Sequence, residues 1–193
     1  MHFTLADLVT DITQNGAESG ASLLELSVSE TADSGAKGEF RFTVKDNGKG
    51  MSLEELKMVQ DPFVTDGVKH PHRKVGLGIP FLIQTAEQSN GGWKIESVKK
   101  PEANNGTTVS AWFDLGNVDT PPVGDIPGLF RTVLLFSGPS EIIIRRILET
   151  QADPINYEVR KTELVEALGE LEDTQSLILL DKYLRSLEEN EEG

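Results

Sequence analysis

The chain has 193 residues, of which 37% are hydrophobic and 26% charged, the balance expected of a soluble globular protein. No apolar run reaches the roughly 20 residues of a membrane span, and the N-terminus does not resemble a signal peptide. The lack of cysteine excludes disulfides and thiolate metal sites, and the net charge of −14 should repel nucleic acid and anionic lipid. We therefore expect a cytoplasmic protein that binds neither nucleic acid nor a membrane.

The first predicted element is a helix that begins after Thr4. Apolar residues recur there at helical spacing and predict its buried side: Leu5, Leu8, Val9 and Ile12. Asp11, Asn15 and Glu18 form a polar stripe about 100° around the helix from that side. Because the stripe lies beside the buried side rather than opposite it, it is placed to line the edge of a cleft.

Two strands with alternating apolar residues follow. Their apolar positions are Leu24, Leu26 and Val28 in the first strand and Phe40, Phe42 and Val44 in the second. Continuing the second alternation puts Asp46 on the same face as the phenylalanines. A carboxylate on a buried face needs a partner, because burying it alone is costly. Asp46 is therefore the most informative single residue of the sequence.

A turn, a short helix and a long loop come next. Ser52 and Glu55 predict a capping box for a helix over residues 53–59. Residues 61–74 are predicted to form an irregular loop of a length that is usually functional. The loop ends in the densest basic stretch of the chain, residues 69–74, beside the glycine pair at 76 and 78. A helix from about residue 79 and strands at 93–98 and 107–113 complete this part.

The C-terminal third has a different composition. Residues 119–128 contain three prolines and two glycines and predict a linker. Strands are then predicted at 132–136 and 142–147, and helices at 162–171 and 174–187. We divide the chain into a domain at 1–118, the linker at 119–128, an α/β extension at 129–188 and a disordered acidic tail at 189–193. The apolar runs of the extension need burial against the first domain or against a second copy, so a homodimer is one expected outcome.

Three glycine-containing turns, at residues 46–51, 76–78 and 105–107, are weak signals individually. Their order after a helix carrying Asp11 and Asn15 resembles the GHKL group of ATPases, which includes gyrase, a heat-shock chaperone, histidine kinases and MutL. The resemblance covers about residues 4–114. Within the group, the loop motif at 61–65 is most similar to histidine-kinase ATP-binding domains. It implies an α+β fold of Bergerat type, a two-layer α/β sandwich whose mixed sheet is covered by helices on one face.

The resemblance also implies ATP and Mg²⁺ as ligands and assigns roles to residues. Asp46 would accept a hydrogen bond from the adenine amino group, and Thr107 would join it through a water. Gly48, Gly50 and Met51 belong to the same motif, in which the glycines let the backbone approach the base. Asn15 would bind Mg²⁺, and Asp11 stands in the position of a base. The N–H groups of Gly76, Leu77 and Gly78 would bind phosphate. Arg73 or Lys74 would reach the terminal phosphate. Asp11 is one methylene shorter than the glutamate of gyrase-type enzymes.

The implied function is Mg-dependent ATP binding by a protein that phosphorylates or regulates a separate partner in trans. Histidine kinases normally carry a phospho-accepting histidine on a preceding helical hairpin. Here the first helix is predicted at residue 4, so we expect no autophosphorylation by that route. The sequence leaves three alternatives open: a nucleotide-sensing module without catalysis, an anti-sigma-type serine kinase, and a weak ATPase. The extension is either a docking element for the partner or a cover for the main sheet.

Overall fold

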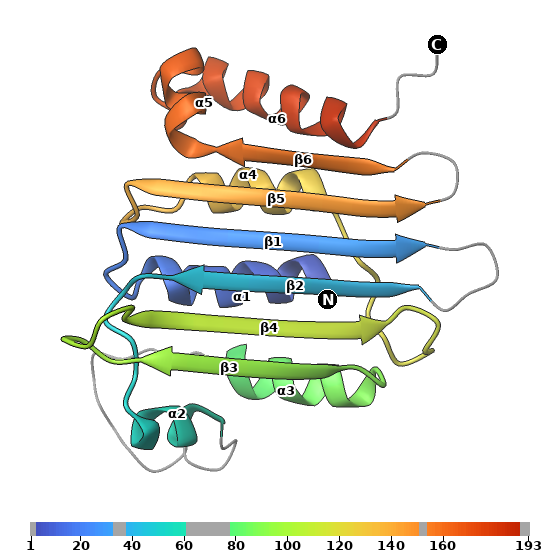
Figure 1. Cartoon of the computed structure of the whole chain (residues 1–193). Helices are drawn as coiled ribbons and strands as arrows, with labels where there is room; N and C mark the ends of the chain where they lie inside the picture. The colour runs from blue at the N-terminus through green and yellow to red at the C-terminus, as the bar shows by residue number, and fades with distance from the viewer. Residues whose placement is uncertain (1–2, 33–37, 61–77, 151–153, 190–193) are drawn as a thin grey trace.

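The structure is a computed structural model that describes residues 3–32, 38–60, 78–150 and 154–189 (Figure 1). Six helices and six strands lie in these ranges. In chain order they are α1 (Leu5–Ala17), β1 (Leu23–Ala32), β2 (Glu39–Asp46), α2 (Leu53–Gln60), α3 (Gly78–Gln88), β3 (Gly92–Val98), β4 (Gly106–Asp114), α4 (Ile126–Leu134), β5 (Glu141–Thr150), β6 (Ile155–Arg160), α5 (Lys161–Leu168) and α6 (Thr174–Glu188).

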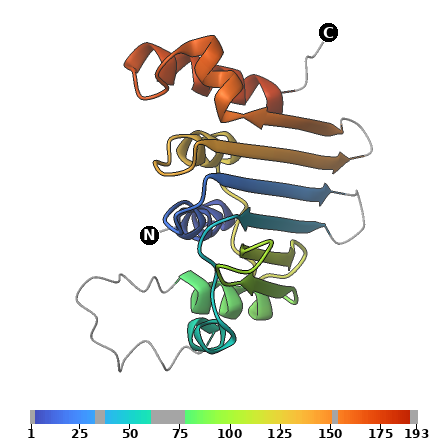
Figure 2. The ribbon, with the colours of Figure 1, turned by 60° about the vertical axis from the view of Figure 1, so that its left-hand side comes forward.

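The strands form one mixed sheet. Their order is β3-β4-β2-β1-β5-β6, and neighbours are antiparallel except for β1 and β5, which run parallel with Leu24 opposite Ile142. Helices α1, α3 and α4 lie along one face of this sheet (Figures 1 and 2). The mixed sheet and its helical layer confirm the predicted two-layer fold.

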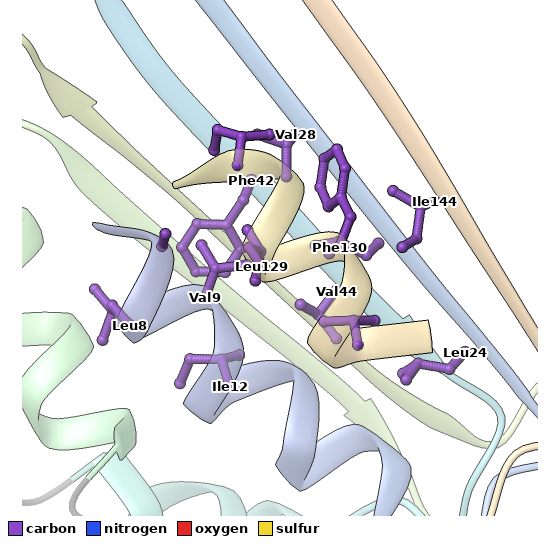
Figure 3. Packing of buried hydrophobic residues seen from close by; sticks show 14 of the residues in the cluster. Leu8, Val9, Ile12, Leu24, Val28, Phe42, Val44, Leu129, Phe130 and Ile144 are labelled. Carbon is purple, nitrogen blue, oxygen red and sulfur yellow. The ribbon is translucent and has the colours of Figure 1, made fainter. Parts of the chain in front are cut away.

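The core fills the space between the sheet and the helices α1, α3, α4 and α6. The side that α1 buries is the one predicted from its spacing, and Leu8 and Val9 are fully buried. Figure 3 shows how residues of α1 and α4 converge on Phe42 and Val44 of β2. The alternation of β2 is also confirmed, because Phe40, Phe42, Val44 and Asp46 are buried on one face. Asp46 thus ends an otherwise apolar row.

The predicted strand at residues 132–136 is wrong. Most of this segment belongs to α4, which begins at Ile126, inside the predicted linker. The buried residues recur at intervals of three, four, seven and eight positions, which is the spacing of a helix: Ile126, Leu129, Phe130, Val133 and Leu134. Pro127 stands in the first turn, where its missing N–H costs nothing. Pro127 therefore lies at the start of a helix rather than interrupting one.

The C-terminal strands continue the same sheet, and α6 is held at its edge by fully buried leucines and by charges. The guanidinium of Arg146 in β5, only 3% exposed, pairs with Glu30 of β1 at 3.0 Å and with Glu188 of α6 at 3.3 Å. The hydroxyl of Tyr157 in β6 donates to the same Glu188 carboxylate at 2.5 Å. One arginine thereby links β1 to the end of α6. The division of the chain into two domains stays a prediction.

The opposite face of the sheet is polar. Thr43 of β2 and Ser110 of β4 share a hydrogen bond of 2.9 Å there, and Arg145 of β5 pairs with Glu25 and Glu158. The guanidinium of Arg41 lies 4.9 Å from the centre of the Trp112 ring. Within the described ranges, no helix has the length and apolar character to cross a membrane.

Candidate functional site

Asp46 ends β2 and faces the helical layer, where it is 7% exposed. Its Oδ1 atom accepts hydrogen bonds from the Ser19 hydroxyl at 2.9 Å and from the Gly48 amide at 2.8 Å. Burial raises the pKa of Asp46, and the hydrogen bonds from Gly48, Ser19 and the Thr107 backbone act against that rise. Both Ser19 and Gly48 donate to Oδ1, so neither of them uses Oδ2.

The chain packs tightly around Asp46. At Gly48, a Cβ would lie 1.8 Å from the Ser19 hydroxyl oxygen and 2.7 Å from Oδ1 of Asp46. At Gly16 in α1, it would lie 2.8 Å from a Leu24 methyl and 3.7 Å from the Asp46 Cβ. Glycine at both positions lets the last turn of α1 and the turn after β2 close on this carboxylate.

Two asparagines hold the turn after β2 in place. The side-chain oxygen of Asn47 accepts from the amides of Ser22 and Leu23 at 2.9 and 3.0 Å. The Asn105 amide donates to the carbonyls of Asn47 and Gly48 at 3.0 and 2.5 Å. The turn is therefore tied to the start of β1 on one side and to the start of β4 on the other.

Thr107 lies directly opposite both Asp46 of β2 and Ser97 of β3 in the sheet. Its hydroxyl is 2.8 Å from the Ser97 hydroxyl. Ser97 also accepts from the Met51 amide at 2.8 Å and donates to the Gly106 carbonyl at 3.1 Å. Met51 and Thr107, both predicted site residues, are thus joined through Ser97.

Asp11 and Asn15 are exposed on α1, near the first residue of α3. A Cβ on Gly78 would lie 3.7 Å from the Asn15 amide nitrogen and 3.9 Å from the Asp11 Cβ. Partial desolvation by neighbouring atoms, assisted by the charge of Asp7, raises the pKa of the Asp11 carboxyl although the side chain is exposed. Glu18, the third residue of the predicted stripe, is exposed and accepts a hydrogen bond from Gln14 at 2.8 Å.

The structure therefore brings together Asp46, Gly48, Met51 and Thr107 at the ends of three strands, and Asn15 with Gly78 at the start of α3. Gly50 is buried with a φ of 62°, and a Cβ there would lie 1.8 Å from the Val98 carbonyl. That glycine lets two segments of the protein approach each other; its role toward a base stays a prediction. Four predicted site residues lie outside the described residues: Arg73, Lys74, Gly76 and Leu77.

Three residues at this site were not predicted from the sequence: Ser19, Ser97 and Asn105. Each acts through a hydroxyl or amide whose partner comes from another element. Ser97 carries one recognisable signal, because it continues the inward alternation of Trp93 and Ile95 in β3. Ser19 follows the end of α1, and nothing in its neighbourhood marks it as a partner of Asp46.

Comparison with known proteins identifies the family of this chain. The family model described as "Histidine kinase-, DNA gyrase B-, and HSP90-like ATPase" matches residues 3–117, more than half of the chain. Sporulation kinase C of Bacillus subtilis (strain 168) is 30% identical over 95 residues, which are 48% of this chain and 20% of that protein. The match thus covers about a fifth of that relative. The chain belongs to the family of histidine kinase-, DNA gyrase B- and HSP90-like ATPases and contains an ATP-binding, histidine-kinase-like module.

Proposed function

We propose that the chain binds Mg·ATP with the adenine amino group on Asp46 and uses it to phosphorylate or regulate a separate partner protein. The observation that carries the adenine assignment is the buried Asp46 carboxylate at the end of an apolar row. Its Oδ1 is held by Ser19 and Gly48, and its Oδ2 is not used by either donor. A fixed carboxylate accepts from an amino group and repels the carbonyl oxygen that guanine carries at the same position.

The phosphates are assigned to the start of α3. Helix N-termini attract anions through their free N–H groups and their dipole, and Gly78 begins this 11-residue helix. Asn15 lies beside it and makes no side-chain hydrogen bond to a described residue. Its amide oxygen is a hard ligand of the kind that Mg²⁺ accepts, and Mg²⁺ often takes one or two protein ligands with the rest from phosphates and water. The roles of Gly76, Leu77, Arg73 and Lys74 follow the family resemblance alone.

Transfer of the phosphate to a partner is supported by the family and by the name of the kinase that the chain resembles. Phosphoryl transfer depends chiefly on positioning and charge neutralisation, so a partner that supplies the acceptor would complete the reaction. Weak ATP hydrolysis is a second candidate. Asp11 favours it, because a carboxyl whose pKa is raised is a better base.

Asp46→Asn tests the binding proposal. We expect wild-type protein to bind Mg·ATP in calorimetry and the variant to bind at least about tenfold more weakly, because a hydrogen bond to a charged acceptor is lost. The fold should persist, since an amide oxygen can still accept from Ser19 and Gly48. Asp119→Asn is the control, because it removes the same charge from an exposed position. Equal affinities of wild type and Asp46→Asn would refute the assignment.

The same proteins then separate the possible reactions. They are incubated with ATP labelled on the terminal phosphate, with and without candidate partner proteins. The expected result is label on a partner in the presence of wild type and none with Asp46→Asn. Release of labelled phosphate without transfer would instead indicate an ATPase. Binding with neither product would indicate a nucleotide sensor.

A further inference from the structure

Ser97 is the junction of three strand ends around the candidate adenine site. Its hydroxyl contacts the Met51 amide, the Gly106 carbonyl and the Thr107 hydroxyl at 2.8, 3.1 and 2.8 Å. These three partners come from the turn after β2, the first residue of β4, and the residue that faces Asp46. The side chain is half-buried, so water competes only in part for these contacts.

The directions of these hydrogen bonds follow from counting hydrogens. A serine hydroxyl has one hydrogen to donate and two lone pairs that accept. The Gly106 carbonyl can only accept, so its contact uses the Ser97 hydrogen; the Met51 amide can only donate, so it occupies one Ser97 lone pair. For the contact with Thr107, Ser97 has one lone pair left. Thr107 must therefore donate to Ser97.

This direction fixes what Thr107 offers to a ligand. Because its hydrogen points to Ser97, the Thr107 oxygen has lone pairs available to a ligand bound beside Asp46. Asp46, directly opposite Thr107 in the sheet, also presents an acceptor. An amino group with two hydrogens suits such a pair, either directly or through a water that donates to Thr107. An oxo group at the same position would face two acceptors.

We propose that Ser97 is a positioning residue that determines base specificity, because it holds Thr107 as an acceptor and so selects a 6-amino over a 6-oxo purine nucleotide. This inference rests on the proposed ATP binding. A purely structural role is the alternative, in which Ser97 only ties Met51 to β3. The two differ in one respect: a structural tie affects all nucleotides alike, whereas an oriented acceptor affects the amino purine alone.

The test compares affinities for ATP and for inosine triphosphate, which carries an oxo group in place of the amino group. In Ser97→Ala, Thr107 is free to rotate and donate. We expect ATP to bind about two- to tenfold more weakly, the range for one hydrogen bond, and inosine triphosphate to be unaffected or improved. The preference for ATP should fall by at least the factor by which ATP binding weakens. Ser97→Thr keeps a hydroxyl on a strand and should retain the wild-type preference.

Two further variants isolate the cause. In a Thr107→Val background, Ser97→Ala should have no additional effect on the preference, because the oriented group is gone. Ser110→Ala is the matched control. It breaks a second hydroxyl pair between neighbouring strands, Thr43 with Ser110 at 2.9 Å, but on the opposite face of the sheet. It should leave both affinities unchanged.

Two outcomes overturn the inference while leaving ATP binding intact. One is an equal loss of affinity for both nucleotides in Ser97→Ala, and the other is an undiminished effect of Ser97→Ala in the Thr107→Val background. Wild-type protein that binds no ATP would refute the proposed function and this inference with it.

Discussion

Gly106 lies where β4 begins beside the end of β2. Its φ of 134° belongs to a region that residues with a side chain rarely adopt, and a Cβ there would lie 1.9 Å from the Asp46 carbonyl oxygen. Neither the backbone of β2 nor that of β4 can move away without breaking the pairing of Asp46 with Thr107. Glycine at position 106 therefore allows β2 and β4 to approach each other closely at the candidate site.

Gly106→Ala should destabilise the protein by roughly 2–5 kcal/mol, because an unfavourable φ and a backbone clash act together. Urea denaturation measures this change. Gly20→Ala is the control, since Gly20 has a φ of 78° but no atom within 4 Å of the added Cβ. Gly20→Ala should destabilise the protein only through the unfavourable positive φ, by about 1 kcal/mol. Similar losses in the two variants would mean that the clash is relieved by a small shift.

At the scale of elements, α2 is held at its start by side-chain hydrogen bonds. None of its residues is fully buried. Its start is fixed by a reciprocal pair, in which the Ser52 amide donates to Glu55 at 2.8 Å and the Glu55 amide donates to the Ser52 hydroxyl at 3.2 Å. Lys99, just after β3, donates to the same Glu55 carboxylate at 2.8 Å. Glu55 therefore anchors α2 to the end of β3.

The contacts that Glu55 makes with Ser52 and Lys99 should be lost in acid. The hydrogen bond from Lys99, followed by that from Ser52, lowers the pKa of Glu55 from 4.5 to about 2. A lowered pKa in the fold means that the stabilisation is complete above about pH 4.5 and is lost as the pH falls towards 2. The protection of the Ser52 amide against hydrogen exchange, taken relative to the intrinsic exchange rate at each pH, should fall over this interval. Glu55→Gln, which keeps a side-chain acceptor without the titrating charge, should lose that dependence; an unchanged profile would argue against Glu55 as the cause.

Some elements can be predicted from the sequence and others cannot, because some depend on neighbouring residues and others on distant ones. The faces of α1 and β2 depend on residues two to four positions apart, so a short window contains the whole signal. The start of α4 is not predicted because the prolines and glycines of residues 119–128 indicate a linker, although the apolar residues from Ile126 onward have helical spacing. The pairing of β1 with β5 and the contacts of Ser19 and Ser97 depend on register between distant segments. No local pattern contains that information.

At the scale of the molecule, the candidate site and the C-terminal elements lie at different parts of one sheet. Asp46, Ser97 and Thr107 are at the left-hand ends of β2, β3 and β4 in Figure 1, whereas α6 lies beyond β6 at the upper edge. Arg146 joins the centre of the sheet to the C-terminal helix, because it contacts Glu30 in β1 and Glu188 in α6. The attachment of the C-terminal helix should therefore depend on this side chain as well as on Leu180 and Leu184, which are fully buried in the hydrophobic core.

Arg146→Met should cost about 3 kcal/mol in urea denaturation, because it leaves two carboxylates without their partner in a largely buried place. Arg145→Met provides the comparison. Arg145 is the adjacent residue and also pairs with two carboxylates, but on the open face with its side chain 39% exposed. Exposed pairs contribute little, so its loss should be below about 1 kcal/mol. Equal effects would show that burial does not decide the strength of these pairs.

The parallel pairing of β1 with β5 also affects when the sheet can form during synthesis. The hydroxyl of Ser140, just before β5, bonds to the carbonyl of Ser22, just before β1, across 118 positions of the chain. At a synthesis rate of about 5–20 residues per second, β5 follows β1 from the ribosome on the order of ten seconds later. Until then, the side of β1 that will receive β5 presents unpaired N–H and C=O groups, the arrangement through which separate chains pair and aggregate. The nascent protein is thus most exposed to aggregation after its family-matched segment has been made and before residues 141–150 emerge.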